Sequence, residues 1–155
     1  MEKLIKQIYK IFSSFQDLSL LMIRLILAYG FYEPAMKKIN NFESIVNWFG
    51  EGLHLPFPLL NAILATSTEV IGVLLIFLGL MTRFISIPMM VIMVVAIITV
   101  HLPHGFHASD NGFEIPLYYS IMLFVLLSHG PGKYSLDEIL FKKYFGAKEK
   151  EKKGT

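Results

Sequence analysis

Cysteine is absent from the 155-residue chain, and its absence excludes several kinds of chemistry. Without it there is no disulfide, no thiolate nucleophile and no Cys-ligated zinc or iron–sulfur centre. The sequence also lacks haem, flavin and nucleotide motifs. Charge is scarce, because 17% of the residues are charged against about 25% in a typical soluble domain. No basic stripe with interleaved aromatic residues lies outside the two ends, so we expect no nucleic-acid partner.

Hydrophobic residues make up 54% of the chain and gather in long runs. A membrane-spanning helix needs about 20 mainly apolar residues. Candidate runs lie at residues 18–35, 57–80, 85–102 and 113–128, and the last is short and opens with Glu114. The sequence therefore predicts an all-α protein, a transmembrane four-helix bundle over residues 17–129. A soluble helical protein with buried core helices is the alternative.

The segments on either side of the predicted bundle are rich in lysine. In residues 1–16, apolar side chains recur at helical spacing opposite the lysines, which predicts an amphipathic helix lying at the membrane surface. In residues 130–155, Ser135 and Glu138 form a capping-box pattern, which predicts a short C-terminal helix followed by a lysine-rich tail. The first apolar run starts late and reaches full spanning length, so we expect no cleavable signal peptide.

The distribution of Lys and Arg predicts how the bundle sits in the membrane. Basic residues are concentrated before the first run, between the second and third at Arg83, and after the fourth. The opposite side has only Lys37 and Lys38, and the 102–113 connection has neither Lys nor Arg. Because short cytoplasmic loops carry the excess of basic residues, we expect both termini to be cytoplasmic and residues 100–114 to face outward.

Two charged residues, Arg24 and Glu69, lie inside predicted spans. A charge in hydrocarbon costs at least about 2.5 kcal/mol, so such residues usually face the bundle interior and pair. Glu69 lies beside a face of small and polar residues that includes Asn61 and Gly72, and Arg24 shares a face with Ala28, Phe31, Tyr32 and Ala35. Their depths differ by about the reach of an arginine side chain, so we predict an Arg24–Glu69 pair. The pair either fixes helix register or takes part in function.

The segment VHLPHGFHASDNGFEIPLYYS (residues 100–120) combines several titratable side chains. His101 and Glu114 bracket the connection, so we expect them to lie close together, with Lys37 and Tyr118 nearby. Histidine exchanges protons near neutral pH, and desolvation can raise the pKa of a carboxyl group into that range. His101, His104 and His107 cannot share one helix face, so we predict no metal site, although a curled loop could gather them. A polar turn is the simpler interpretation of His104 and His107.

Four stretches together resemble the DoxX family of small four-helix membrane proteins. They are RLILAYGFYEPAMKK (24–38), TEVIGVLLIFLGLMTR (68–83), the H-x-x-H-G-F and N-G-F-E elements of 101–114, and GPGKYSLD (130–137). The resemblance covers roughly residues 18–137. The matching positions are Arg24, Lys37, Glu69, Gly72, Arg83, His101 and Glu114. Pro34 and Ala35 stand where the family usually has a glycine before its lysine.

The resemblance implies an inner-membrane protein linked to redox chemistry. Relatives include a subunit of a thiosulfate:quinone oxidoreductase, and others act with sulfur or oxidative-stress partners. Our hypothesis is the membrane component of a quinone-linked redox system that binds a quinone or small substrate and relays protons. The proposed catalytic residues are His101, Glu114 and Glu69, and the proposed binding residues are Arg24, Lys37, Asn61 and Tyr118. The alternatives are a non-catalytic membrane anchor for an oxidoreductase partner and a small-solute transporter acting as a homodimer.

Overall fold

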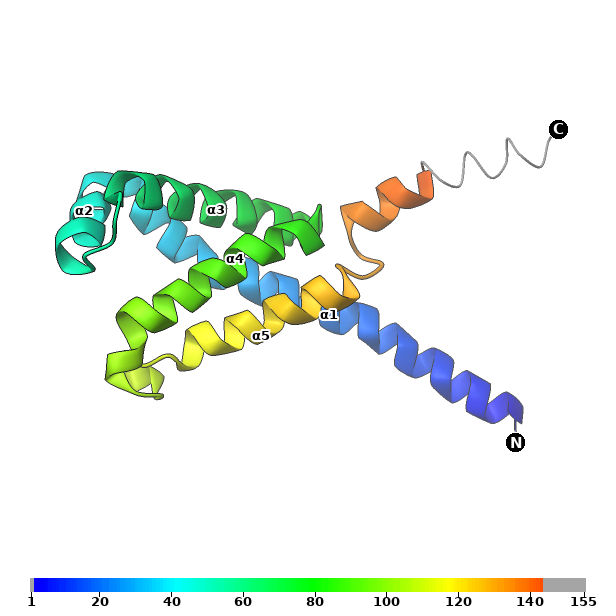
Figure 1. The fold of residues 1–155 in the computed structure, drawn as a ribbon. Coiled ribbons are helices and arrows are strands. Elements are labelled where there is room, and N and C mark those ends of the chain that lie inside the picture. The colour runs from blue at the N-terminus through cyan, green and yellow to red at the C-terminus, as the bar shows by residue number, and fades with distance from the viewer. Residues whose placement is uncertain (1, 144–155) are drawn as a thin grey trace.

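The described part of the chain is almost entirely helical (Figure 1). The structure, a computed structural model, describes the backbone of residues 2–143 and the side chains of Phe12 and residues 15–143. The helices are α1 (Glu2–Asn40), α2 (Phe42–Asn47), α3 (Pro58–Leu78), α4 (Thr82–Ala96) and α5 (Glu114–His129). π-helical turns at Trp48–Gly52 and Ile97–His101 extend α2 and α4, and residues 136–143 are again helical. The all-α prediction is confirmed: residues 2–143 contain no strand.

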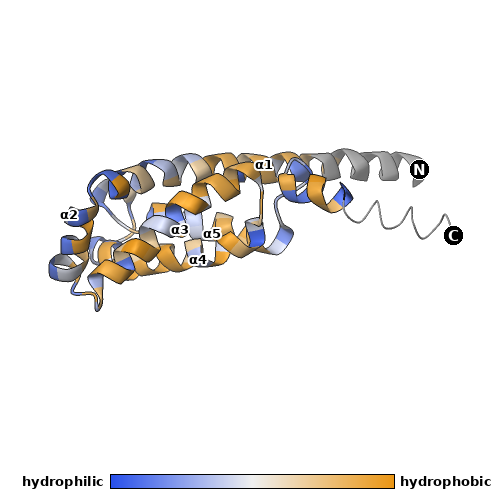
Figure 2. Cartoon of the chain, turned by 90° about the horizontal axis from the view of Figure 1, so that it is seen from above, coloured by the Kyte–Doolittle hydropathy of each residue, from blue (hydrophilic) through white to orange (hydrophobic). Residues whose placement is uncertain are grey.

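The long apolar helices make this a multi-pass membrane protein. Phe15–Asn40, Pro58–Leu78 and Thr82–His104 are each long and apolar enough to cross a membrane, while α5 is apolar but only 16 residues long. Hydrophobic residues occupy most of these helices, and hydrophilic ones gather near α2 and near the C-terminal segment (Figure 2). The predicted runs thus correspond to α1, α3, α4 and α5.

One predicted boundary, between a surface helix ending at residue 16 and a first span, is absent. Helix α1 is continuous from Glu2 to Asn40. The first glycine after Glu2 is Gly30 and the first proline is Pro34, so no residue interrupts the helical hydrogen bonds near residue 16. The side chains of residues 2–11 and the lysine-rich tail at 144–155 lie outside the described part of the structure. The amphipathic face and the tail therefore stay predictions.

The bundle has two distinct ends. At the turn end, α3 and α4 are joined through Gly79 and Met81, which both have positive φ, and residues 130–137 lie across this turn. At the loop end lie residues 41–57 and 102–113. Helix α1 packs mainly on α3, and α4 packs mainly on α5. From the turn end, α3 and α4 spread apart like a V, with α1 passing behind them (Figure 1).

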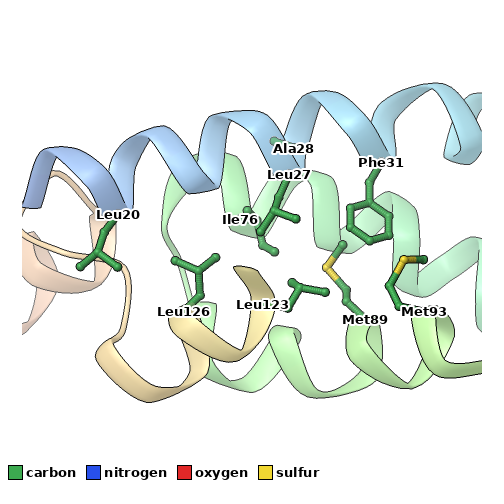
Figure 3. Close-up of a cluster of buried hydrophobic side chains, with 9 residues drawn as sticks. All are labelled: Leu20, Leu27, Ala28, Phe31, Ile76, Met89, Met93, Leu123 and Leu126. Carbon is green, nitrogen blue, oxygen red and sulfur yellow. The ribbon is translucent and has the colours of Figure 1, made fainter. Parts of the chain in front are cut away.

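The buried core lies where the two helix pairs meet, on the turn-end side of the molecule. Its members are Leu20, Leu27, Ala28, Phe31, Ile76, Met89, Met93, Leu123 and Leu126 (Figure 3). Small residues let membrane helices approach closely, and Gly72 does so here: an added Cβ would lie 2.5 Å from Met89 Sδ. The Gly72–Met89 contact is therefore a point of close approach between α3 and α4.

The segment 130–137 forms a clasp over the turn end. The Asp137 carboxylate accepts hydrogen bonds from the backbone N–H groups of Met81 (2.9 Å) and Thr82 (3.3 Å), where α4 begins. Lys133 binds the Asp17 carboxylate through its backbone N–H and its Nζ, and the side-chain bond to this carboxylate raises the pKa of Lys133. Ser135 Oγ accepts the N–H of Glu138 at 3.2 Å, as the capping pattern predicts. The clasp thus joins α1, the α3–α4 turn and the C-terminal helical segment.

We expect Asp137→Ala to lower the free energy of unfolding by about 1–2 kcal/mol, the usual loss for a helix N-terminal cap. Two N–H groups at the start of α4 would lose their acceptor. Glu138→Gln is the matched control, because its side chain makes only a partly exposed pair with Lys142, and a change below about 0.5 kcal/mol is expected. Reversible unfolding in mixed detergent micelles measures both. Equal losses in the two variants would contradict the capping role.

Candidate functional site

A cavity of about 1330 Å³ lies between the helices on the loop-end side of the Gly72–Met89 contact. Its walls come from α1, α3, α4 and α5, and the π-helical turn at Trp48–Gly52 and the 102–113 connection border it at the loop end. Most of its lining is apolar, with a few polar groups. Small-molecule sites in proteins have this composition. The cavity is therefore the candidate binding site.

The polar centre of the cavity is a buried ion pair between Lys38 and Glu69. Lys38 Nζ lies 2.7 Å from Glu69 Oε1 and 2.6 Å from Oε2. The side chain of Glu69 is 2% exposed and that of Lys38 is 16% exposed. Both residues line the cavity. An ammonium and a carboxylate so shielded from water interact strongly and keep a fixed geometry.

The predicted Arg24–Glu69 pair is wrong. The Arg24 guanidinium instead donates to the carbonyl oxygens of Ile76 (2.8 Å) and Phe77 (2.7 Å), in the last turn of α3. It also donates to the carbonyl oxygens of Pro131 (3.2 Å) and Tyr134 (2.7 Å) in the clasp. These groups lie at the turn end, about 10–15 Å along α3 from Glu69.

The unpaired carbonyls at a helix C-terminus attract a cation, which explains the direction that the Arg24 side chain takes. Arg24 is 1% exposed and is absent from the cavity lining. Its predicted role in ligand binding stays a prediction, and the structure gives Arg24 no place at the cavity wall. Arg24 joins α1 to the end of α3 and to the clasp.

Lys38, rather than Lys37, is the lysine inside the bundle. Lys37 Nζ lies 2.6 Å from Glu33, one turn earlier on the exposed side of α1, and the two side chains are 70% and 73% exposed. Both also contribute to the lining of the cavity. The sequence contained the signal for Lys38, because the face that joins Arg24 to Ala35 continues at helical spacing to residue 38.

His101 and Asn61 line the cavity, as their predicted roles require. The π-helical turn Ile97–His101 places His101 at the loop end, where its Nδ1–H donates to the carbonyl oxygen of Asn111 at 2.7 Å. In the neutral ring this leaves Nε2 as a proton acceptor. Asn61 donates from Nδ2 to the carbonyl oxygen of Pro56 at 2.6 Å, which fixes its amide. The cavity therefore combines a base, an amide and an ion pair.

Glu114 and Tyr118 do not line the cavity. The Glu114 carboxylate accepts the N–H of Ala108 at 2.9 Å and the hydroxyl of Tyr118 at 3.1 Å. It therefore holds the 102–113 connection in place, and its expected partnership with His101 is replaced by these two bonds. Successive residues on a helix point about 100° apart, so the next residue, Tyr119, faces the cavity instead.

Two histidines at the connection, His101 and His104, are hydrogen-bonded to the backbone. His104 donates from Nδ1 to the carbonyl oxygen of Val100 at 2.9 Å, and His101 is bonded to Asn111. Within the described residues, no three His, Asp or Glu side chains converge as metal ligands would. The arrangement is that of a polar turn.

Comparison with known proteins identifies the family. Residues 19–102, more than half of the chain, match the DoxX family model. The chain belongs to the DoxX family. The matched part contains Lys38, Glu69 and His101, and so most of the cavity of this DoxX protein, whereas α5 and the clasp lie beyond it.

Several relatives align along most of this DoxX protein. A Haemophilus influenzae protein named as uncharacterized is 35% identical, over 81% of this chain and 85% of its own. The Bacillus subtilis protein named "Putative oxidoreductase CatD" is 28% identical, over 81% and 90% of the two chains. The Mycobacterium tuberculosis membrane protein Rv3486 is 27% identical, over 81% and 83%. No solved structure matches the chain.

Proposed function

We propose that this DoxX-family protein is the membrane component of a quinone-linked redox system. It would lie in a bacterial-type inner membrane with both termini cytoplasmic and the loop end outside, as the distribution of Lys and Arg predicts. The observation that carries the proposal is the mostly apolar cavity with the buried Lys38–Glu69 pair inside it. The name of the Bacillus subtilis relative contains the word oxidoreductase, which also supports a redox function.

The chemistry of the cavity suits a quinone. The Lys38 ammonium can donate a hydrogen bond to a quinone carbonyl oxygen, and the apolar walls can hold the ring. Reducing a quinone to a quinol takes two electrons and two protons. The electrons would come from an oxidoreductase partner, and the Lys38–Glu69 pair would pass protons to the quinone oxygens. His101, at the loop end of the cavity, would exchange protons with water.

A second candidate function is that of a non-catalytic membrane anchor for an oxidoreductase. It is favoured by the ion pair itself, because Lys38 binds both carboxylate oxygens of Glu69, as a purely structural pair would. Under this reading the pair serves only folding. Glu69→Gln and His101→Ala would then leave the activity of the complex intact wherever the protein accumulates in the membrane.

Trp48 offers a direct test of quinone binding. It is the chain's single tryptophan and it lines the cavity. In lipid nanodiscs, a decyl-tailed ubiquinone analogue should quench Trp48 fluorescence in a saturable manner. The double variant Lys38→Met/Glu69→Met, which leaves no unpaired charge, should raise the Kd about tenfold, because a hydrogen bond to a charged group contributes about 1.5–3 kcal/mol.

The control variant is Lys142→Met, since this exposed lysine pairs with Glu138 in the C-terminal helical segment, remote from the cavity. Its Kd should equal that of the wild type. Quenching that rises linearly with quinone concentration, and equally in all three proteins, would reflect partition into the lipid. That result would contradict quinone binding and favour the anchor.

A further inference from the structure

The cavity is closed on the side where α1 faces α5. The ring of Tyr119 packs on Phe31 with ring centroids 5.3 Å apart. The Tyr119 hydroxyl also lies so close to Gly30 that a Cβ at that position has no room. One tyrosine on α5 therefore fills the space between these two helices.

The side between α3 and α4 is open. The two helices touch at Gly72 and Met89, and every cavity-lining residue of α3 precedes Gly72 in the sequence. Toward the loop end the helices spread apart, as Figure 1 shows. Three apolar residues there, Leu64, Val91 and Val95, line the cavity and yet are 56%, 57% and 42% exposed. They form the rim of a gap.

The depth of this gap shows that it faces the bilayer. Along α4, the lining residues that are also exposed are Ile87, Val91 and Val95. At about 1.5 Å per residue, they cover about 12 Å of a hydrocarbon core that is about 30 Å thick. An opening at these apolar, exposed residues of a spanning helix meets lipid chains.

The size of the cavity leaves room for more than a headgroup. Pockets that enclose a whole drug-sized ligand measure about 300–1000 Å³, and this cavity measures about 1330 Å³. The Lys38–Glu69 pair that lines it is buried, while Leu64, Val91 and Val95 at the gap are apolar. Between this pair and the gap, the polarity therefore falls toward the lipid.

We propose that the gap between α3 and α4 is a lateral doorway for a membrane-dissolved, long-tailed quinone. The headgroup reaches the Lys38–Glu69 pair while the tail lies along Leu64, Val91 and Val95 and continues into the bilayer. This inference rests on the proposed function and names its substrate class. A lipid-soluble quinone enters from the membrane plane, and a water-soluble small molecule is not the ligand.

Two quinones and two matched variants test the doorway. The quinones share one fully substituted benzoquinone ring and differ in bearing a methyl group or a decyl tail. Val91→Phe fills the gap, and Val94→Phe makes the same change on the same helix at an exposed residue, 48% accessible, that does not line the cavity. Trp48 quenching in nanodiscs gives a Kd for each protein. For each quinone, the Kd of a variant is compared with the Kd of the wild type. The difference between the two quinones in partition into lipid then does not enter the comparison.

Val91→Phe should raise the Kd of the decyl quinone at least fivefold and change that of the methyl quinone less than twofold. Val94→Phe should change neither. Two results would contradict the doorway in a wild type that binds both quinones. In one, Val91→Phe weakens the binding of both quinones equally. In the other, it weakens the binding of neither, which would mean that bilayer lipid alone occupies the gap. If the wild type binds neither quinone, the proposed function itself fails, and the doorway with it.

Discussion

Replacing Lys38 by methionine should lower the free energy of unfolding by about 3–5 kcal/mol, the usual consequence of removing one partner of a buried ion pair. Glu69 would remain 2% exposed without its cation. The carboxylate would then either stay charged in a low-dielectric interior or take up a proton, and both outcomes cost free energy. Unfolding titrations in mixed micelles measure the loss.

A second substitution shows whether the loss of stability in Lys38→Met comes from the unpaired charge of Glu69 or from lost packing. Lys38→Met/Glu69→Met should recover most of the stability, because apolar replacement of both partners of a buried pair is often neutral or stabilising. Lys37→Met is the matched control: the neighbouring lysine pairs with Glu33 at the surface, and a change below about 1 kcal/mol is expected. If the double variant were as unstable as the single one, the stability would come from the shape of the two side chains and not from their charges.

The span pattern could be predicted from the sequence because the bilayer imposes it. A segment that crosses hydrocarbon must satisfy its own backbone hydrogen bonds and present apolar side chains, so composition alone revealed α1, α3 and α4. The cap at Ser135 was equally local, since it depends on residues three apart. These features need no knowledge of tertiary structure.

The partners of long side chains could not be predicted in this way. When only residue numbers are counted, the depths of Arg24 and Glu69 differ by about the reach of an extended arginine. The count ignored other acceptors, namely the carbonyls at the end of α3 and those of the clasp, which lies more than a hundred residues further along the chain. Long-range backbone acceptors leave no pattern in a sequence.

The site residues chosen from the sequence also differ by one position from those that face the interior of the bundle. Lys37 and Tyr118 were chosen, whereas the neighbouring Lys38 and Tyr119 face the interior of the bundle. A shift of one residue turns a helical side chain by about 100°, so the choice matters. Following the face of Phe31 and Ala35 would have reached Lys38. For Tyr119 the sequence had no comparable signal, because α5 is apolar on all sides.

Arg24→Met should lower the free energy of unfolding by at least about 0.5 kcal/mol and by as much as about 9 kcal/mol, and it should also loosen the clasp. Four carbonyl oxygens would lose their donor, at about 1–3 kcal/mol each. Removing a charge from the membrane interior returns only about 2.5–3.5 kcal/mol, so the lost bonds outweigh this gain. Arg24→Lys replaces the planar guanidinium by a single ammonium group. It should recover only part of the stability that Arg24→Met loses.

Because Arg24 holds the carbonyl oxygens of Pro131 and Tyr134, the same variant should expose the Lys133–Tyr134 peptide bond to trypsin. Cleavage after Lys133 should become at least about tenfold faster in Arg24→Met under native conditions, as expected when local opening becomes easier by about 1.4 kcal/mol. Lys37→Met removes an exposed cation at the opposite end of the bundle and should leave this rate unchanged. Equal cleavage rates in Arg24→Met and the wild type would show that Asp17 and Asp137 alone hold the clasp closed.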